Sequence, residues 1–145
     1  MKKIVHILAS IVSMTCIGTF MLATIYIELM GEGQDIAFVK NLIVSPGLFV
    51  LVPAIMLAGA SGFSLSIGRK GRLVEAKKKR MPVVALNGVF VLIPSAIFLD
   101  QWASVGAFDT SFYILQVIEL LAGSVNLTLM GMNMRDGFRL SGRFR

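Results

Sequence analysis

The stretch LIVSPGLFVLVPAIMLAGASGFSLSI, residues 42–67, decides the fold because none of its 26 side chains is charged. As a helix rising 1.5 Å per residue it would extend over about 39 Å, which exceeds the roughly 30 Å hydrocarbon core of a bilayer. The sequence therefore predicts a transmembrane helix here. Three further runs, which together contain a single acid, predict three more such helices: residues 4–27, 82–99 and 111–134.

The composition of the whole chain agrees with a membrane protein. Of its 145 residues, 56% are hydrophobic and 15% are charged, whereas an ordinary soluble domain has roughly 25% charged residues. We expect a single four-helix domain over residues 1–145, because this length leaves no room for a second core. The chain has one cysteine and one histidine, no serine nucleophile beside a base and no paired acids, so we expect neither an enzyme nor a metal site.

The basic residues predict the orientation in the membrane. Thirteen of the fourteen lysines and arginines fall at the N-terminus, in residues 69–80 or in residues 135–145, and only Lys40 falls elsewhere. Because basic flanks are retained on the cytoplasmic side, both termini are expected to be cytoplasmic. The short connections make neighbouring helices antiparallel, which predicts an up-down-up-down bundle in the inner membrane of a bacterial cell.

The basic segments next to the membrane, a loop over residues 68–81 and a tail over residues 135–145, are expected to set the topology. They should also attract anionic lipid headgroups, by about 1 kcal/mol per basic residue. The net charge of +6 therefore points to the bilayer rather than to nucleic acid. The expected headgroup contacts are Arg69, Lys70, Arg72, Lys77, Lys78, Lys79 and Arg80.

Two spans carry faces that predict helix contacts. Helices in lipid associate through small and polar side chains, and the second span has small residues every fourth position. The fourth span places its amide and carboxyl groups at spacings of three and four residues, so this face must point into the bundle or into a partner. The small ridge is Ala54, Ala58, Gly62 and Ser66, and the polar face is Phe112, Gln116, Glu119, Gly123, Asn126, Met130 and Asn133.

Glu119 is the only acid in any predicted span, and no lysine or arginine lies in a span to pair with it. We therefore expect it to be protonated and to donate a hydrogen bond to a backbone carbonyl. Pro53 and Pro94 each free the carbonyl four residues earlier. Those carbonyls, at Phe49 and Phe90, and the side chain of Thr19 are expected at about the same depth as Glu119.

Two interpretations of this polar level stay open. In the first, Glu119 holds the bundle together with Gln116 and Asn126. In the second, the same groups form a proton or small-cation site of the kind that transporters build near the middle of the membrane. Contact of Glu119 with another subunit is a further alternative.

His6 lies in the motif Lys3-Ile4-Val5-His6-Ile7-Leu8-Ala9. This motif resembles the first helix of small bacterial four-helix membrane proteins of the copper-resistance D kind, where such a histidine is taken to be a haem ligand. The resemblance implies haem b binding through His6. This chain departs from the pattern because it has no second histidine, so a methionine from the group at 130, 132 and 134 would have to be the second axial ligand.

From the sequence we expect a non-catalytic accessory or complex-forming subunit of the inner membrane, with no cofactor, present as a homo-oligomer or in a larger membrane complex. A proton- or cation-coupled carrier using Glu119 is the alternative, and a haem b protein is the third hypothesis.

Overall fold

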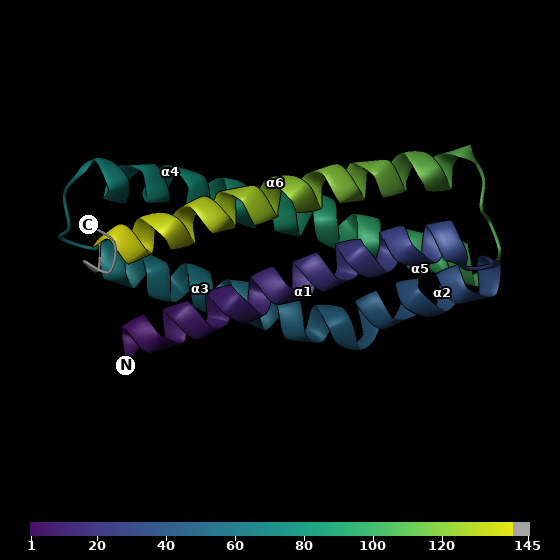
Figure 1. Ribbon diagram of the computed structural model, residues 1–145, viewed down its shortest axis with the longest axis horizontal. Helices are drawn as coiled ribbons and strands as arrows, with labels where there is room; N and C mark the ends of the chain where they lie inside the picture. Colours follow the sequence, from purple (N-terminus) through teal and green to yellow (C-terminus); the bar gives the residue numbers. More distant parts are fainter. Residues whose placement is uncertain (141–145) are drawn as a thin grey trace.

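The computed structural model describes residues 1–140, and its regular elements in this range are all helical (Figure 1). Two short elements join α-helices into longer segments: η1 is a kink at which Ser45 leaves the helical conformation, and η2 is a π-helical turn. The elements in chain order are α1 (Lys2–Met30), α2 (Gly33–Leu42), η1 (Ile43–Leu48), α3 (Phe49–Ser66), α4 (Arg72–Asn87), η2 (Gly88–Leu92), α5 (Ile93–Ser104) and α6 (Thr110–Leu140).

Four helical segments are long and apolar enough to cross a membrane, which makes the chain a multi-pass membrane protein. Two of them, α1 and α6, are uninterrupted, and the other two are α2–η1–α3 (Gly33–Ser66) and α4–η2–α5 (Arg72–Ser104). The four predicted spans lie within these segments, apart from Ile67 at the end of the second span, but the segments are longer. Only residues 31–32, 67–71 and 105–109 connect them.

The second segment begins nine residues before the predicted span because α2 has a strong start signal. Glu32 and Asp35 form a capping box, in which the Glu32 amide donates to the Asp35 carboxylate over 3.0 Å. Residues 33–41, which the sequence predicts as part of a loop, are therefore helical. This correction matters because it moves Lys40 from a loop into the bundle.

The basic loop predicted over residues 68–81 is also mostly helix, since α4 begins at Arg72. Gly71 precedes it with a φ of 136°, a backbone conformation that favours glycine. Residues 72–80 consist largely of Arg, Glu, Ala and Lys, which are strong helix formers. Likewise, residues 135–140 of the predicted tail belong to α6, and residues 141–145 lie outside the described residues.

Proline positions account for the breaks in the second and third segments. In η1 the residue before Pro46, Ser45, has an extended backbone (φ −138°, ψ 109°), which is the conformation that a following proline favours. The turn η2 ends shortly before Pro94, whose ring removes a helical amide. By contrast, Pro53 lies inside α3, which continues past it.

The buried apolar side chains form two clusters at different heights. The first cluster is Ile17, Leu51, Val84 and Met130, and the second cluster is Ile36, Leu99, Ala103 and Phe112.

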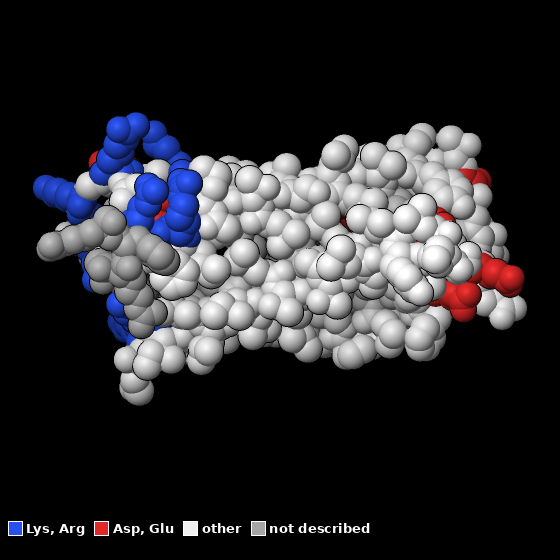
Figure 2. Space-filling view, in the orientation of Figure 1, with Lys and Arg blue, Asp and Glu red and all other residues white. Residues whose placement is uncertain are grey.

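The two ends of the bundle differ in charge. Lysines and arginines gather at the end where α1 begins and α6 ends, and acids gather at the opposite end (Figures 1 and 2). We call the first the basic end, which includes residues 67–71, and the second the acidic end, which includes residues 31–32 and 105–109. The long surface between them is free of lysine and arginine in the view of Figure 2.

Candidate polar site within the bundle

The bundle contains an ion pair between Lys40 of α2 and Glu119 of α6. The Lys40 Nζ donates to Glu119 Oε2 over 2.9 Å and also lies 3.4 Å from Thr24 Oγ1 of α1. The Lys40 side chain is 1% exposed and that of Glu119 is 13% exposed. A charge at this depth is expensive unless it is paired. The pair therefore ties α1, α2 and α6 together at a fixed register.

This pair corrects the expectation that Glu119 has no basic partner and donates to a carbonyl. The sequence predicts Lys40 in an external loop, but α2 carries it about two turns into the bundle. The sequence did contain a signal, because Lys40 is the single exception to an otherwise complete separation of basic residues. A lone basic residue on the acidic side, in the helix that follows a capping box, is a candidate partner for a lone intramembrane acid.

A small cavity adjoins the pair. It has a volume of about 40 Å³ and is lined by Glu119 and Thr24 among mostly apolar residues. Both interrupted segments contribute to its wall, because Leu48 belongs to η1 and Leu92 to η2. Unwound or π-helical turns in membrane helices often mark functional positions. The cavity thus lies between the two broken segments of the described chain and the half-buried carboxylate of Glu119.

The cavity and the pair lie between the two apolar clusters. Along α6 the order is Phe112 of the second cluster, then Glu119, then Met130 of the first. At 1.5 Å per residue, Glu119 lies about 10 Å along the helix axis from Phe112 and about 16 Å from Met130. Along α1, Thr24 likewise follows Ile17 of the first cluster. Apolar side chains therefore separate the polar site from both ends of the bundle.

The other predicted members of the polar level are scattered. Thr19 is exposed on the outer surface of α1, so the buried threonine of this helix is Thr24. Pro53 is exposed and Pro94 half-buried. Gln116 is buried, and its Oε1 has no hydrogen-bond partner among the described residues. Thr19 and Pro53 therefore face outward and do not join Glu119 inside the bundle, because depth along a helix does not determine which face a side chain occupies.

Asn126 makes a separate polar contact nearer the middle of α6. The Asn87 amide of α4 donates to Asn126 Oδ1 over 2.9 Å and to the Ala122 carbonyl over 2.8 Å. In turn, the Asn126 amide donates to the Val84 carbonyl over 3.3 Å. Amides that satisfy each other in this way join α4 to α6 without charge.

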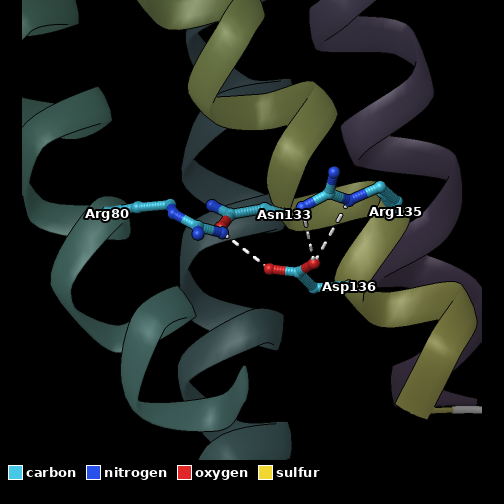
Figure 3. A network of polar contacts seen from close by, with 4 residues as sticks. All are labelled: Arg80, Asn133, Arg135 and Asp136. Carbon is cyan, nitrogen blue, oxygen red and sulfur yellow. Dashed lines mark hydrogen bonds and ion pairs between the residues drawn. The ribbon is translucent and has the colours of Figure 1, made fainter. Parts of the chain in front are cut away.

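A third polar cluster lies at the basic end (Figure 3). Asp136 of α6 is 1% exposed and lies 2.7 Å from the Arg80 guanidinium and 3.4 Å from that of Arg135. Arg80 also donates to Asn133 Oδ1 over 3.5 Å. Asp136 is not among the residues that the sequence singles out. Arg80 is predicted to contact lipid headgroups, although the structure directs it to Asp136.

The remaining basic residues of the predicted headgroup surface are mostly exposed. Lys77 is half-buried, as its position next to Gly137 of α6 requires. The exposed members are Arg69, Lys70, Arg72, Lys78 and Lys79.

The predicted small ridge packs against α1. Ala54 and Ala58 are buried, and Gly62 is so close to α1 that a Cβ built on it would lie 2.9 Å from His6 Cε1. Ser66, at the end of the ridge, donates to the Phe63 carbonyl of its own helix. The close approach therefore covers the first three positions.

His6 is part of the same helix contact. Its Nδ1 lies 3.0 Å from the Ala58 carbonyl, to which it donates as the protonated ring nitrogen, and 3.4 Å from Ser61 Oγ. Met130 packs in the first apolar cluster. Haem ligation by His6 stays a prediction, and the contacts give the histidine a packing role. Among residues 1–140, no three His, Cys, Asp or Glu side chains gather where they could share a metal ion.

Comparisons of the chain with family models, with curated proteins and with solved structures each returned no match.

Proposed function

We propose that the protein is a non-catalytic, multi-pass subunit of the bacterial inner membrane that acts within an oligomer or a larger membrane complex. The observation that supports this proposal is the pairing of polar groups on α6 with polar groups on other helices. Lys40 of α2 pairs with Glu119, and α4 supplies Asn87 to Asn126 and Arg80 to Asp136. These carboxylates, amides and basic groups are already paired within the bundle, so we infer that they hold the helices together rather than catalyse a reaction. The same pairs fix the shape of the bundle.

The proposed orientation is an up-down-up-down bundle with both termini in the cytoplasm. It is supported by the concentration of basic residues at the basic end, where α1 begins and α6 ends (Figures 1 and 2). Reporters fused after Arg145 or inserted into residues 67–71 should behave as cytoplasmic, and reporters inserted into residues 105–109 as external. A cytoplasmic signal from residues 105–109 would refute this orientation.

The subunit role is tested by purification in a mild detergent. We expect a tagged chain to elute as a defined multimer or with a membrane protein in fixed ratio, and the complex should survive exchange into lipid nanodiscs. A strictly monomeric chain in nanodiscs would refute the proposal.

A carrier is the second candidate, favoured by the cavity that adjoins Glu119 and is walled by both broken segments. Transporters build the sites for their coupling ions from interrupted helices and an intramembrane ionisable group. Its test is proton or cation flux into proteoliposomes, with Lys40→Met combined with Glu119→Leu as the control, because this pair removes the carboxylate without leaving a buried charge unpaired. Flux in wild type that vanishes in this variant would favour the carrier over the subunit.

A further inference from the structure

A hollow lies on the surface of α6 near the basic end, and we call it the α6 hollow. Among the described residues it is lined by Gly131, Met134, Arg135, Phe138 and Arg139, and its volume is about 350 Å³. This volume falls within the range of small-molecule pockets, about 300–1,000 Å³. The lining combines two guanidinium groups with apolar side chains, so it suits an amphipathic anion.

The positive charge of the α6 hollow is only partly matched by acids of the chain. Arg135 lies 3.4 Å from Asp136, but Arg80 approaches the same carboxylate more closely, at 2.7 Å. The Arg135 side chain is 59% exposed, and Figure 3 shows one of its guanidinium nitrogens directed away from Asp136. Arg139 is exposed and makes no ion pair with a described acid. Both guanidinium groups can therefore donate to an anion from outside the chain.

The basic and apolar parts of the α6 hollow follow one another along the helix. Arg139 lies near the end of α6, and Gly131 lies about 12 Å deeper along the axis. A Cβ built on Gly131 would meet, among the described residues, only Met14 Cε at 4.0 Å, so the deep end of the hollow has room for a chain. A phospholipid has the same order, because its phosphate lies at the interface and its acyl chains extend toward the membrane centre.

We propose that the α6 hollow binds one anionic phospholipid from the leaflet at the basic end. Arg135 and Arg139 hold its phosphate, and one acyl chain lies along Phe138, Met134 and Gly131. An anionic headgroup is favoured over a zwitterionic one, because two guanidinium groups repel the cation of a choline headgroup. The inference goes beyond the proposed subunit role and does not depend on it, since a monomer would bind the lipid through the same residues.

The test compares retention of phosphatidylglycerol and phosphatidylcholine with identical acyl chains. The full chain is placed in detergent micelles that contain equal amounts of both lipids, and native mass spectrometry counts the lipids bound to each chain. We expect the wild type to retain phosphatidylglycerol preferentially. Arg135→Gln combined with Arg139→Gln should weaken this retention about 30-fold, since each basic residue near a headgroup contributes about a factor of five.

Two charge controls distinguish the hollow from general attraction by basic residues. Lys78→Gln combined with Lys79→Gln removes the same charge from exposed positions of α4 and should leave the retention nearly unchanged. Arg143→Gln combined with Arg145→Gln changes arginines outside the described residues and should also leave it nearly unchanged. If either control loses phosphatidylglycerol as strongly as the variant of the two hollow arginines, the proposal is wrong.

A shape control tests the place of the acyl chain without any change of charge. Gly131→Leu fills the deep end of the α6 hollow and should abolish the preferential retention, and it decides the question alone if the arginine variant does not fold. Gly59→Leu is the matched control on α3, because a Cβ at Gly59 meets nothing within 4 Å. Unchanged retention in Gly131→Leu would refute the acyl-chain site. Inorganic phosphate should not displace the lipid, and displacement at an equal concentration would indicate a site for a free anion instead.

Discussion

Two ion pairs join α6 to the two broken segments, Lys40–Glu119 and Arg80–Asp136, and they bury opposite partners. In the inner pair, the cation Lys40 is 1% exposed and Glu119 is 13% exposed. In the pair at the basic end, the carboxylate of Asp136 is 1% exposed and Arg80 is 20% exposed. Asp136 also has a second cation, Arg135, whose side chain is 59% exposed.

This difference indicates how each half of the bundle tolerates charge. At the basic end, the long arginine side chains can extend to water while they hold a buried acid. In the other half, Lys40 and Glu119 balance each other one to one between two apolar clusters. Loss of one partner should therefore be far more costly for the inner pair than for the pair at the basic end.

The largest effect is expected for Glu119→Gln. The amide keeps the volume of the side chain but leaves the Lys40 ammonium buried without a counter-charge, which should lower the free energy of unfolding by about 3–5 kcal/mol. The measurement is equilibrium unfolding in mixed micelles. Lys40→Met combined with Glu119→Leu should regain most of the loss, because an apolar pair replaces both charges. A Glu119→Gln variant as stable as wild type would instead support a protonated Glu119.

The next largest effect is expected for Gly62→Leu. This variant tests whether the stability of the half of the bundle nearer the basic end depends on helix packing rather than on its ion pair. A Cβ at Gly62 would lie 2.9 Å from His6 Cε1 and 3.0 Å from Met81 Cε. Overpacking of this kind should cost about 1–3 kcal/mol of unfolding free energy. Gly59→Leu is the matched control on the same helix, because a Cβ at Gly59 meets nothing within 4 Å. Equal losses in both variants would refute the close contact of α1 with α3.

A smaller effect is expected for Asp136→Asn. Arg80 and Arg135 lose their carboxylate, but both can turn toward water, so the cost should be about 1 kcal/mol, in the range of a single hydrogen bond. Glu75→Gln, an exposed acid of α4, should be neutral in the same unfolding measurement. A loss for Asp136→Asn as large as that for Glu119→Gln would remove the contrast between the two pairs.

Apolar run length was enough to predict the four spans, because a run of about twenty uncharged and mostly apolar residues is typical of a helix that crosses a bilayer. The helix ends were missed where polar residues formed helix anyway, as at the capping box of Glu32 and Asp35. The inner face of α6 was predictable because its polar residues recur at spacings of three and four, and Gln116 and Asn126 of this face are buried.

The partners of that face could not be predicted. A residue-by-residue count of depth assumes straight helices, whereas η1 and η2 shift the two segments that meet α6. Lys40 was assigned to the wrong environment because α2 begins at the capping box of Glu32 and Asp35, well before the apolar run. Asp136 was hidden among arginines that the topology argument had already explained. Which side chains pair between two helices depends on where each helix begins and where it breaks. A capping residue such as Glu32 can begin a helix more than two turns before its apolar run.

The smallest expected effect is the salt dependence of the two pairs. The coupling energy of each pair can be measured with double-mutant cycles, Arg80→Gln with Asp136→Asn and Lys40→Gln with Glu119→Gln. Raising N-methyl-D-glucamine chloride from about 0.01 to 1 M shortens the screening length from about 30 to 3 Å. The Arg80–Asp136 coupling should fall by about 0.3 kcal/mol, because Arg80 is partly exposed. The Lys40–Glu119 coupling should change less, because Lys40 is 1% exposed and the pair lies between the two apolar clusters. Equal salt dependence of both couplings would mean that water and ions reach Lys40, and the enclosure by the two apolar clusters would then be wrong.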